Sequence, residues 1–188
     1  STQAINAKLG LHSSPTGEIY FEDCRVPASC VVGEVNQGFK ICMTMLDNTR
    51  LSCATRAVGV ARACLDAAMN YAQERTQFGK PLADFQLIRA DLAVMYVEDE
   101  AARLLVLKAA HEKEMDPNVR NTMSVSVAKY YAAETAVKAA NMGLKIFGSY
   151  GFSTEYPAER LYRDAKSFQI VEGTSNIQKI IISNNLLK

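Results

Sequence analysis

The sequence predicts a mainly α protein: an antiparallel helical bundle preceded by a short β segment. From about Asn36 onward, apolar residues recur with the helical period in three long segments that are separated by short breaks. Strand-forming residues gather only in residues 1–35. Long helices joined by short connections pack antiparallel. We therefore divide the chain into a β remnant at 1–35 and a helical bundle domain at 36–188.

The β segment centres on Glu18–Val26, which is rich in strand-formers and is flanked by turn residues and by Pro27. So few residues cannot form a sheet that is stable alone. We therefore expect the segment to be the end of a β structure whose other strands lie elsewhere.

The first helix is expected from about residue 37 to Gln73, and the second from about Phe85 to Glu114. The intervening Arg75–Pro81 contains a glycine and a proline, which interrupt the helical pattern. The expected buried stripes consist of apolar residues at helical spacing: Ile41, Met45, Leu46, Val58, Ala61, Leu65, Ala68 and Met69 in the first helix, and Leu87, Ile88, Leu92, Met95, Leu104, Leu105 and Leu107 in the second.

A third helix is expected to open at Asp116-Pro117, an N-cap residue followed by proline, and to run to about Ile146. Gly148–Gly151 is a turn, Pro157 begins a short helix to about Arg163, and Thr174 or Ser175 caps a final helix to Leu187. Alanine pairs on the long helices favour close packing. The apolar run 101–107 indicates burial on several sides, as in an oligomer.

The composition excludes several classes of protein. A net charge of +1 leaves no cationic surplus for a nucleic acid, and no apolar run is long enough to span a membrane. The first residues do not resemble a signal peptide. Five cysteines without Cys-x-x-Cys spacing, together with only two histidines, argue against a zinc site. They indicate reduced, mostly buried thiols in a cytosol-like compartment.

Three short stretches are candidate sites, and each has an ordinary structural interpretation. Glu172 is either a surface acid at a helix start or, if buried, a general base. Arg75–Gly79 either ends a helix or holds a phosphate and stacks a planar ring. Gly148–Gly151 lacks the dinucleotide-binding spacing and follows a helix. The sequence also lacks the paired Glu-x-x-His motifs of a di-iron bundle and the Gly-x-Ser-x-Gly motif of a hydrolase.

Taken together and in order, these stretches resemble the C-terminal half of the acyl-CoA dehydrogenases. The resemblance covers essentially the whole chain. The matching stretches are Lys8–Thr16, Phe21–Pro27, Arg75–Leu82 with Phe85 and Gln86, Tyr150–Phe152, Glu155–Pro157, Arg163–Ala165 and Glu172–Gln178.

The resemblance implies an FAD-dependent oxidation of an acyl-CoA thioester to the trans-2-enoyl-CoA. Glu172 would take the α-proton, the β-hydrogen would leave as hydride to the flavin, and the Glu172 backbone N–H would help to polarise the thioester carbonyl. One subgroup of the family places its base on the first long helix. Thr49 occupies that position here, which favours Glu172.

The resemblance also implies further site residues. The cofactor-binding set is Arg75, Gln77, Phe78, Phe85, Gln86, Lys145, Gly148, Ser149, Thr174, Ser175 and Asn176, in which Arg75, Gln77 and Phe78 reach the FAD of a neighbouring subunit. The substrate-binding set is Asp47, Arg50 and Gly173. Lys145 and Ser149 depart from the family pattern, in which a Gln and paired glycines are common.

Other expectations concern the whole protein. Family members carry an N-terminal helical domain and most of a middle β-domain ahead of the part matched here, so residues 1–35 would be the remnant of that middle domain and the chain a fragment, inactive alone. Expected partners are an acyl-CoA, an electron-transfer flavoprotein and further copies in a homo-oligomer, a dimer or tetramer. The expected compartment is the cytoplasm or the mitochondrial matrix. The alternatives are an acyl-CoA oxidase or a non-catalytic oligomerisation module.

Overall fold

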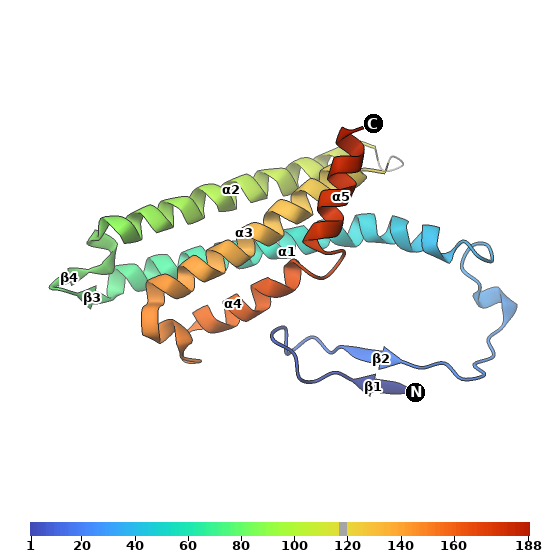
Figure 1. The fold of residues 1–188 in the computed structure, drawn as a ribbon, viewed down its shortest axis with the longest axis horizontal. Helices are drawn as coiled ribbons and strands as arrows, with labels where there is room; N and C mark the ends of the chain where they lie inside the picture. The colour runs from blue at the N-terminus through green and yellow to red at the C-terminus, as the bar shows by residue number, and fades with distance from the viewer. Residues whose placement is uncertain (117–119) are drawn as a thin grey trace.

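The computed structural model describes residues 1–116 and 120–188. Within these residues the chain is mainly helical, with α1 (Gly38–Glu74), α2 (Gln86–Met115), α3 (Thr122–Phe147), α4 (Pro157–Phe168) and α5 (Ser175–Leu186) (Figure 1). Two short β-hairpins and three 3-10 turns complete it: β1 (Thr2–Ala4), β2 (Gly17–Ile19), β3 (Thr76–Gln77), β4 (Lys80–Pro81), η1 (Ala28–Cys30), η2 (Leu82–Asp84) and η3 (Gly148–Phe152). The predicted fold class is confirmed.

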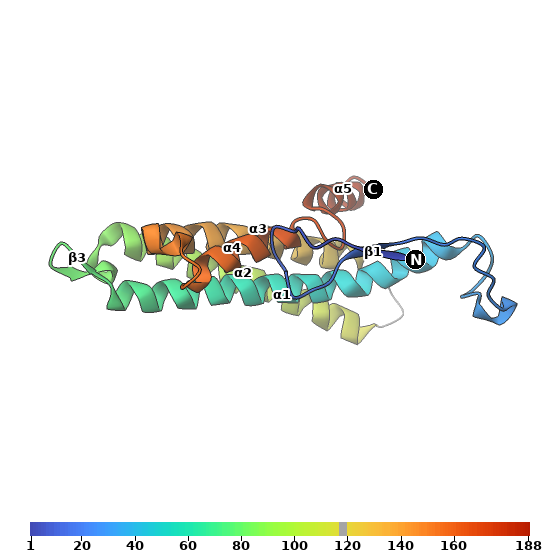
Figure 2. The same ribbon diagram turned by 90° about the horizontal axis from the view of Figure 1, so that it is seen from below.

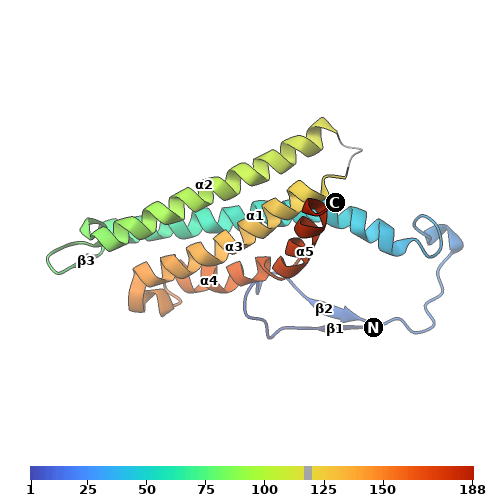
Figure 3. The same ribbon diagram turned by 45° about the horizontal axis from the view of Figure 1, so that its top comes forward.

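The three long helices lie side by side and alternate in direction, so that α2 runs antiparallel to both α1 and α3 (Figure 1). Helix α4 packs against α1 and α3 on the side away from α2 (Figures 1 and 3). Helix α5 packs on α3 and stands outside the layer of the other helices (Figure 2). This arrangement brings the α4–α5 connection against the middle of the bundle.

Small side chains let the helices approach closely. The buried core is dominated by alanines of the three long helices, among them Ala54, Ala57, Ala61, Ala68, Ala72, Ala102, Ala109, Ala128, Ala132, Ala133, Ala136, Ala139 and Ala140. Larger buried residues such as Leu65, Met95 and Val125 fill the remaining space. The alanine pairs expected to favour close packing are 67–68, 101–102, 109–110, 132–133 and 139–140. Each pair has at least one buried member, so close packing through these pairs is confirmed.

Several predicted boundaries and positions were wrong. Asp116 is the C-terminal cap of α2, and α3 begins only at Thr122, while Pro117 lies outside the described residues. Helix α4 continues to Phe168, because burial of Ala165 and Phe168 against the bundle extends it.

The predicted apolar stripes were also partly wrong. The affected residues lie on surfaces that the described chain leaves uncovered: Ile41 and Met45 near the start of α1, and Leu87, Leu104 and Leu107 on the outer face of α2.

The N-terminal segment is largely exposed and contacts the bundle at one point. Strands β1 and β2 pair antiparallel, with Thr2 opposite Ile19. In the loop between them, the Leu11 N–H donates to Asp164 Oδ1 at 2.6 Å, and Arg163 donates to the Leu9 carbonyl at 3.0 Å. This contact holds the loop of the β segment against α4.

The five cysteines are free in the structure, as expected for reduced thiols. Cys53 and Cys64 are buried, but Cys24, Cys30 and Cys42 are exposed, so the expectation of mostly buried thiols was wrong. Within residues 1–116 and 120–188, no helix combines the length and hydrophobicity required to span a membrane. The same residues contain no cluster of three or more His, Cys, Asp or Glu side chains able to hold a metal ion.

Candidate active site

Glu172 lies in the loop between α4 and α5 in an unusual backbone conformation. Its φ is +57°, and that of Gly173 is +90°, so two consecutive residues occupy the left-handed region. A non-glycine residue pays about 1–2 kcal/mol for this conformation. Gly173 is required here for a second reason, since a Cβ at that position would lie 2.8 Å from Gln178 Nε2. The backbone at Glu172 therefore has to be held by its surroundings.

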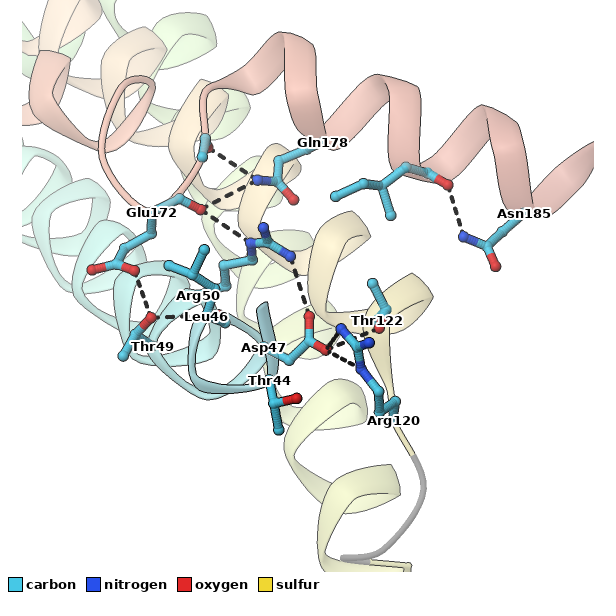
Figure 4. A network of polar contacts seen from close by, with 12 residues as sticks. Thr44, Leu46, Asp47, Thr49, Arg50, Arg120, Thr122, Glu172, Gln178 and Asn185 are labelled. Carbon is cyan, nitrogen blue, oxygen red and sulfur yellow. Dashed lines mark hydrogen bonds and ion pairs between the residues drawn. The ribbon is translucent and has the colours of Figure 1, made fainter. Parts of the chain in front are cut away.

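Three buried side chains hold it (Figure 4). Arg50 Nε donates to the Glu172 carbonyl at 3.1 Å, and Gln178 Nε2 lies 3.4 Å from the same oxygen. Gln178 Nε2 also donates to the Gly173 carbonyl at 3.0 Å, and Lys129 Nζ donates to it at 2.6 Å. The donors come from α1, α3 and α5. Both carbonyls are thus directed into the protein.

The Glu172 side chain points the other way, toward a cavity. Its Oε2 accepts a hydrogen bond of 2.5 Å from the Thr49 hydroxyl of α1 (Figure 4). Glu172 is half-buried and lines a cavity of about 350 Å³ together with residues between Lys8 and Thr16 and the end of α4. The carboxylate is therefore fixed by one hydroxyl donor at the edge of a space large enough for part of a ligand.

Asp47 supports the Glu172 loop through Arg50. One of its oxygens lies 3.2 Å from Arg50 Nη1, and the other accepts from Arg120 at 2.6 and 2.9 Å and from the Thr122 hydroxyl at 3.1 Å (Figure 4). Asp47 and Arg50 are both buried. The pair that was predicted to bind substrate thus forms a brace, in which Asp47 holds Arg50 and Arg50 holds the Glu172 loop.

Burial perturbs two titratable groups beside this loop. Desolvation lowers the pKa of the Lys129 ammonium, opposed in part by the negative charges near it. Desolvation also raises the pKa of the Cys53 thiol, and the nearby Lys129 charge opposes that shift. Both groups face the interior between α1 and α3, behind the Glu172 carbonyl.

The start of α5 contains the three predicted cofactor residues that follow Gly173. The Thr174 hydroxyl caps the helix by accepting from the Ile177 N–H at 3.3 Å, which decides between the two predicted caps. The Ser175 hydroxyl donates to Glu134 at 2.6 Å, so it is held by α3. Thr174 and Asn176 are exposed close to Glu172 in the sequence.

The other predicted cofactor residues lie at the far end of α1. Arg75 is the C-cap of that helix, and its guanidinium lies 5.0 Å from the centre of the Tyr150 ring. Gln77 and Phe78 belong to the β3–β4 hairpin, in which the Phe78 side chain is 93% exposed. The Phe85 ring lies 6.3 Å from the Phe78 ring. Gln86, Gly148 and Ser149 are exposed near this end.

This end of the bundle has the donor chemistry for a phosphate and an aromatic ring. Arg75 pairs with no carboxylate within the part of the chain that the structure describes, and Phe78 offers an open ring face. Lys145 does not extend this set, because its ammonium lies 2.7 Å from Asp91. Gly148, at φ +61°, leaves open space beside the backbone.

The predicted residues therefore form two groups. Arg50, which holds the Glu172 carbonyl, and Arg75 are 25 positions apart along α1, which at about 1.5 Å per residue corresponds to about 37 Å. Sequence reasoning missed three residues of the first group: Lys129, Gln178 and Arg120. A signal for Lys129 existed, since it occupies the face of α3 that carries Val125, Ala132 and Ala136 and is therefore expected to be buried.

Comparison with known proteins identifies the family. Residues 36–187 match the family model for the acyl-CoA dehydrogenase C-terminal domain. Glutaryl-CoA dehydrogenase from Desulfococcus multivorans is 49% identical over 94% of this chain and 45% of its own length. The structure of butyryl-CoA dehydrogenase from Megasphaera elsdenii superposes with a TM-score of 0.95 at 41% identity, covering 100% of this chain and 49% of that one.

A third comparison concerns electron transfer. A chain in the structure described as the electron transferring flavoprotein of Acidaminococcus fermentans matches with a TM-score of 0.94 at 39% identity, covering 100% of this chain and 49% of that chain. The present chain thus spans about half the length of the relatives it matches. Acyl-CoA dehydrogenases are FAD-dependent flavoproteins. On the family model and these identities, the chain belongs to the acyl-CoA dehydrogenase family as its C-terminal helical domain.

Proposed function

We propose that this chain supplies the catalytic base and the cofactor-binding helical half of an acyl-CoA dehydrogenase, which converts an acyl-CoA thioester to the trans-2-enoyl-CoA. One observation carries the proposal. The only carboxylate of the α4–α5 connection projects toward a cavity, while the backbone behind it is held in a left-handed conformation by three buried donors. A surface acid at a helix start needs no such support.

In this proposal Glu172 removes the α-proton of the thioester. The Thr49 hydroxyl orients its carboxylate through the 2.5 Å hydrogen bond. An α-proton is too weakly acidic for a carboxylate unless the developing enolate oxygen is stabilised by preorganised donors. The Glu172 backbone N–H has no partner within residues 1–116 and 120–188, so it is available to that oxygen. Bound FAD would accept the β-hydrogen as hydride.

The two groups of predicted cofactor residues imply more than one copy of the chain. Thr174, Ser175 and Asn176 follow the proposed base in the chain, whereas Arg75 lies about 37 Å from Arg50 along α1 and Phe78 lies in the adjoining β3–β4 hairpin. We propose that the first group contacts the FAD of its own active site. Arg75 and Phe78 would then bind the FAD of a neighbouring copy, which makes the functional unit a homo-oligomer.

The electrons then leave through a second protein. We propose an electron-transfer flavoprotein as the acceptor, supported by the match to the Acidaminococcus fermentans structure. An oxidase, the alternative acceptor chemistry, would consume oxygen without that partner. Anaerobic reduction followed by reoxidation with either acceptor separates these two possibilities.

The base is tested in a chimera in which residues 1–188 replace the matching half of the Megasphaera elsdenii butyryl-CoA dehydrogenase. Flavin bleaching by butyryl-CoA under anaerobic conditions measures the reaction directly. Glu172→Gln should slow it at least about a hundredfold, since a general base contributes that much or more. Glu114→Gln, at an exposed position on α2, is the matched control and should leave the rate unchanged.

Two results would contradict the proposal. A loss of less than about tenfold in Glu172→Gln would show that another group is the base. A chimera that folds and associates but stays colourless in excess FAD would favour the non-catalytic oligomerisation module instead.

A further inference from the structure

Lys129 is a fully buried cation that the proposed reaction does not use. It lies in the middle of α3, and its exposed fraction is 0%. Its neighbours on the same face, Val125, Ala132 and Ala136, are apolar or small. An unpaired ammonium is costly to bury, so a lysine at this position needs a specific partner. Ion pairing does not supply it, because no carboxylate lies within salt-bridge distance of Lys129 among the residues that the structure describes.

The partner is the backbone of the α4–α5 connection, residues 169–174, which carries the proposed base and is the proposed catalytic loop. Lys129 Nζ donates to the Gly173 carbonyl at 2.6 Å, and the same oxygen accepts from Gln178 Nε2 at 3.0 Å. Arg50, the third donor, holds the preceding carbonyl and is itself paired with Asp47. Lys129 therefore directs its charge at a single peptide oxygen.

The orientation of the two peptides after Glu172 determines which atoms of the loop face the cavity. The Glu172 carbonyl, held by Arg50, shares its peptide with the Gly173 N–H, which is therefore left on the opposite side and has no partner within the described residues. The Gly173 carbonyl belongs to the next peptide, so Lys129 and Gln178 fix the chain between Gly173 and the start of α5. A positive φ at Glu172 costs free energy that the chain would regain by rearranging the loop. The inward hydrogen bonds to the carbonyls of Glu172 and Gly173 oppose that rearrangement.

We propose that Lys129 is a positioning residue, which pins the Gly173 carbonyl and so keeps the α4–α5 loop in the conformation that directs the Glu172 carboxylate at the bound thioester. The part of this proposal that concerns catalysis rests on Glu172 being the base. The part that concerns the loop conformation does not.

The electrostatic surroundings of Lys129 agree with this role. Cys53 and Arg50 face it from α1, Glu134 faces it from its own helix, and Glu172 faces it from the loop. Burial lowers the pKa of Lys129, so the ammonium is less stable here than in water. A residue retained for stability alone would be better replaced by an apolar side chain of similar volume.

The difference between a positioning role and a purely stabilising role can be tested in the chimera with the Megasphaera elsdenii half. Lys129→Met keeps the length of the side chain and removes the hydrogen bond. Amide hydrogen exchange of Ser175, Ile177 and Gln178, whose N–H groups donate to residues of this loop, should accelerate at least about tenfold, while exchange in the α3 core stays unchanged. The kcat for butyryl-CoA should fall about 10- to 100-fold with KM altered less than threefold, because a small misplacement of the base has effects of this size.

Two further variants complete the experiment. Lys138→Met, on the same helix but half-exposed and paired with Glu98, is the control and should change neither readout. Gln178→Met removes the other donor to the Gly173 carbonyl, so its effect on exchange should be coupled to that of Lys129→Met in the double variant.

Unchanged exchange at Ser175, Ile177 and Gln178 in Lys129→Met would overturn the proposal, as would a loss of activity that follows a uniform loss of protection across the bundle. The base assignment fails separately. If Lys129→Met loosens the loop but Glu172→Gln remains active, the loop anchor stands and the identity of the base does not.

Discussion

Replacing Gly173 with alanine probes the catalytic loop most directly. At φ +90°, an L-residue costs about 1–2 kcal/mol relative to glycine. The new Cβ would also lie 2.8 Å from Gln178 Nε2, the donor to the carbonyls of Glu172 and Gly173. Displacing Gln178 leaves buried polar groups unpaired, which costs about 1–3 kcal/mol. We therefore expect Gly173→Ala to lower the free energy of unfolding by about 2–5 kcal/mol.

The chain contains its own control for this prediction. Gly79 has a similar φ of +79°, but a Cβ there meets no atom within 4 Å. Gly79→Ala should therefore show the conformational cost alone, about 1–2 kcal/mol. Urea unfolding of the 188-residue chain, followed by circular dichroism, measures both variants. If Gly173→Ala costs no more than Gly79→Ala, the argument that Gln178 packs against the glycine is wrong.

Two more predictions concern Thr49 and the buried thiols. Thr49→Val removes the hydroxyl donor to Glu172 and should lower kcat in the chimera about 5- to 30-fold, which corresponds to a loss of about 1–2 kcal/mol, whereas Thr49→Ser should stay near wild type. Burial raises the pKa of Cys64 to about 12 from an ordinary 9.0, so the folded chain keeps a proton that the unfolded chain loses. The contribution of the Cys64 thiol to the free energy of unfolding is complete below pH 9 and is lost as pH rises toward 12. The free energy of unfolding of wild type should therefore fall relative to that of Cys64→Ala between pH 9 and 12. Equal slopes of the free energy of unfolding against pH in the two proteins would refute this.

The helical architecture could be predicted because its signals are local. The predicted ends of the first two helices, at Gln73 and Glu114, each lie within one residue of the observed ends, since a Gly-Pro loop and a charged terminus mark them. The helix start predicted at Asp116 was wrong, because this residue ends α2 although aspartate is also a preferred residue at helix starts. The exposed Leu104 and Leu107 were misassigned because an apolar face does not show which molecule covers it.

The site was only half predictable for a related reason. Glu172 and Gly173 were identified from a run of residues that are adjacent in sequence. Lys129 and Gln178 act from other helices, and each resembles an ordinary polar residue until the bundle buries it completely. The contact of Arg50 with the Glu172 loop was also missed, because only the tertiary structure shows it, and the role of Arg50 in substrate binding stays a prediction.

The hydrogen bonds behind Glu172 also bear on the order in which the chain folds. The donors of the catalytic loop are separated from their acceptors by 122 residues for Arg50, 44 for Lys129 and 5 for Gln178. Contacts with sequence separations as long as those of Arg50 and Lys129 are expected to form late, after the entropy of closing the intervening loops has been lost. Glu172, the proposed base, is therefore expected to reach the geometry described above only when α1, α3 and α5 have come together. A chain in which these helices have not yet packed together would contain Glu172 but would not hold its carboxylate in this geometry.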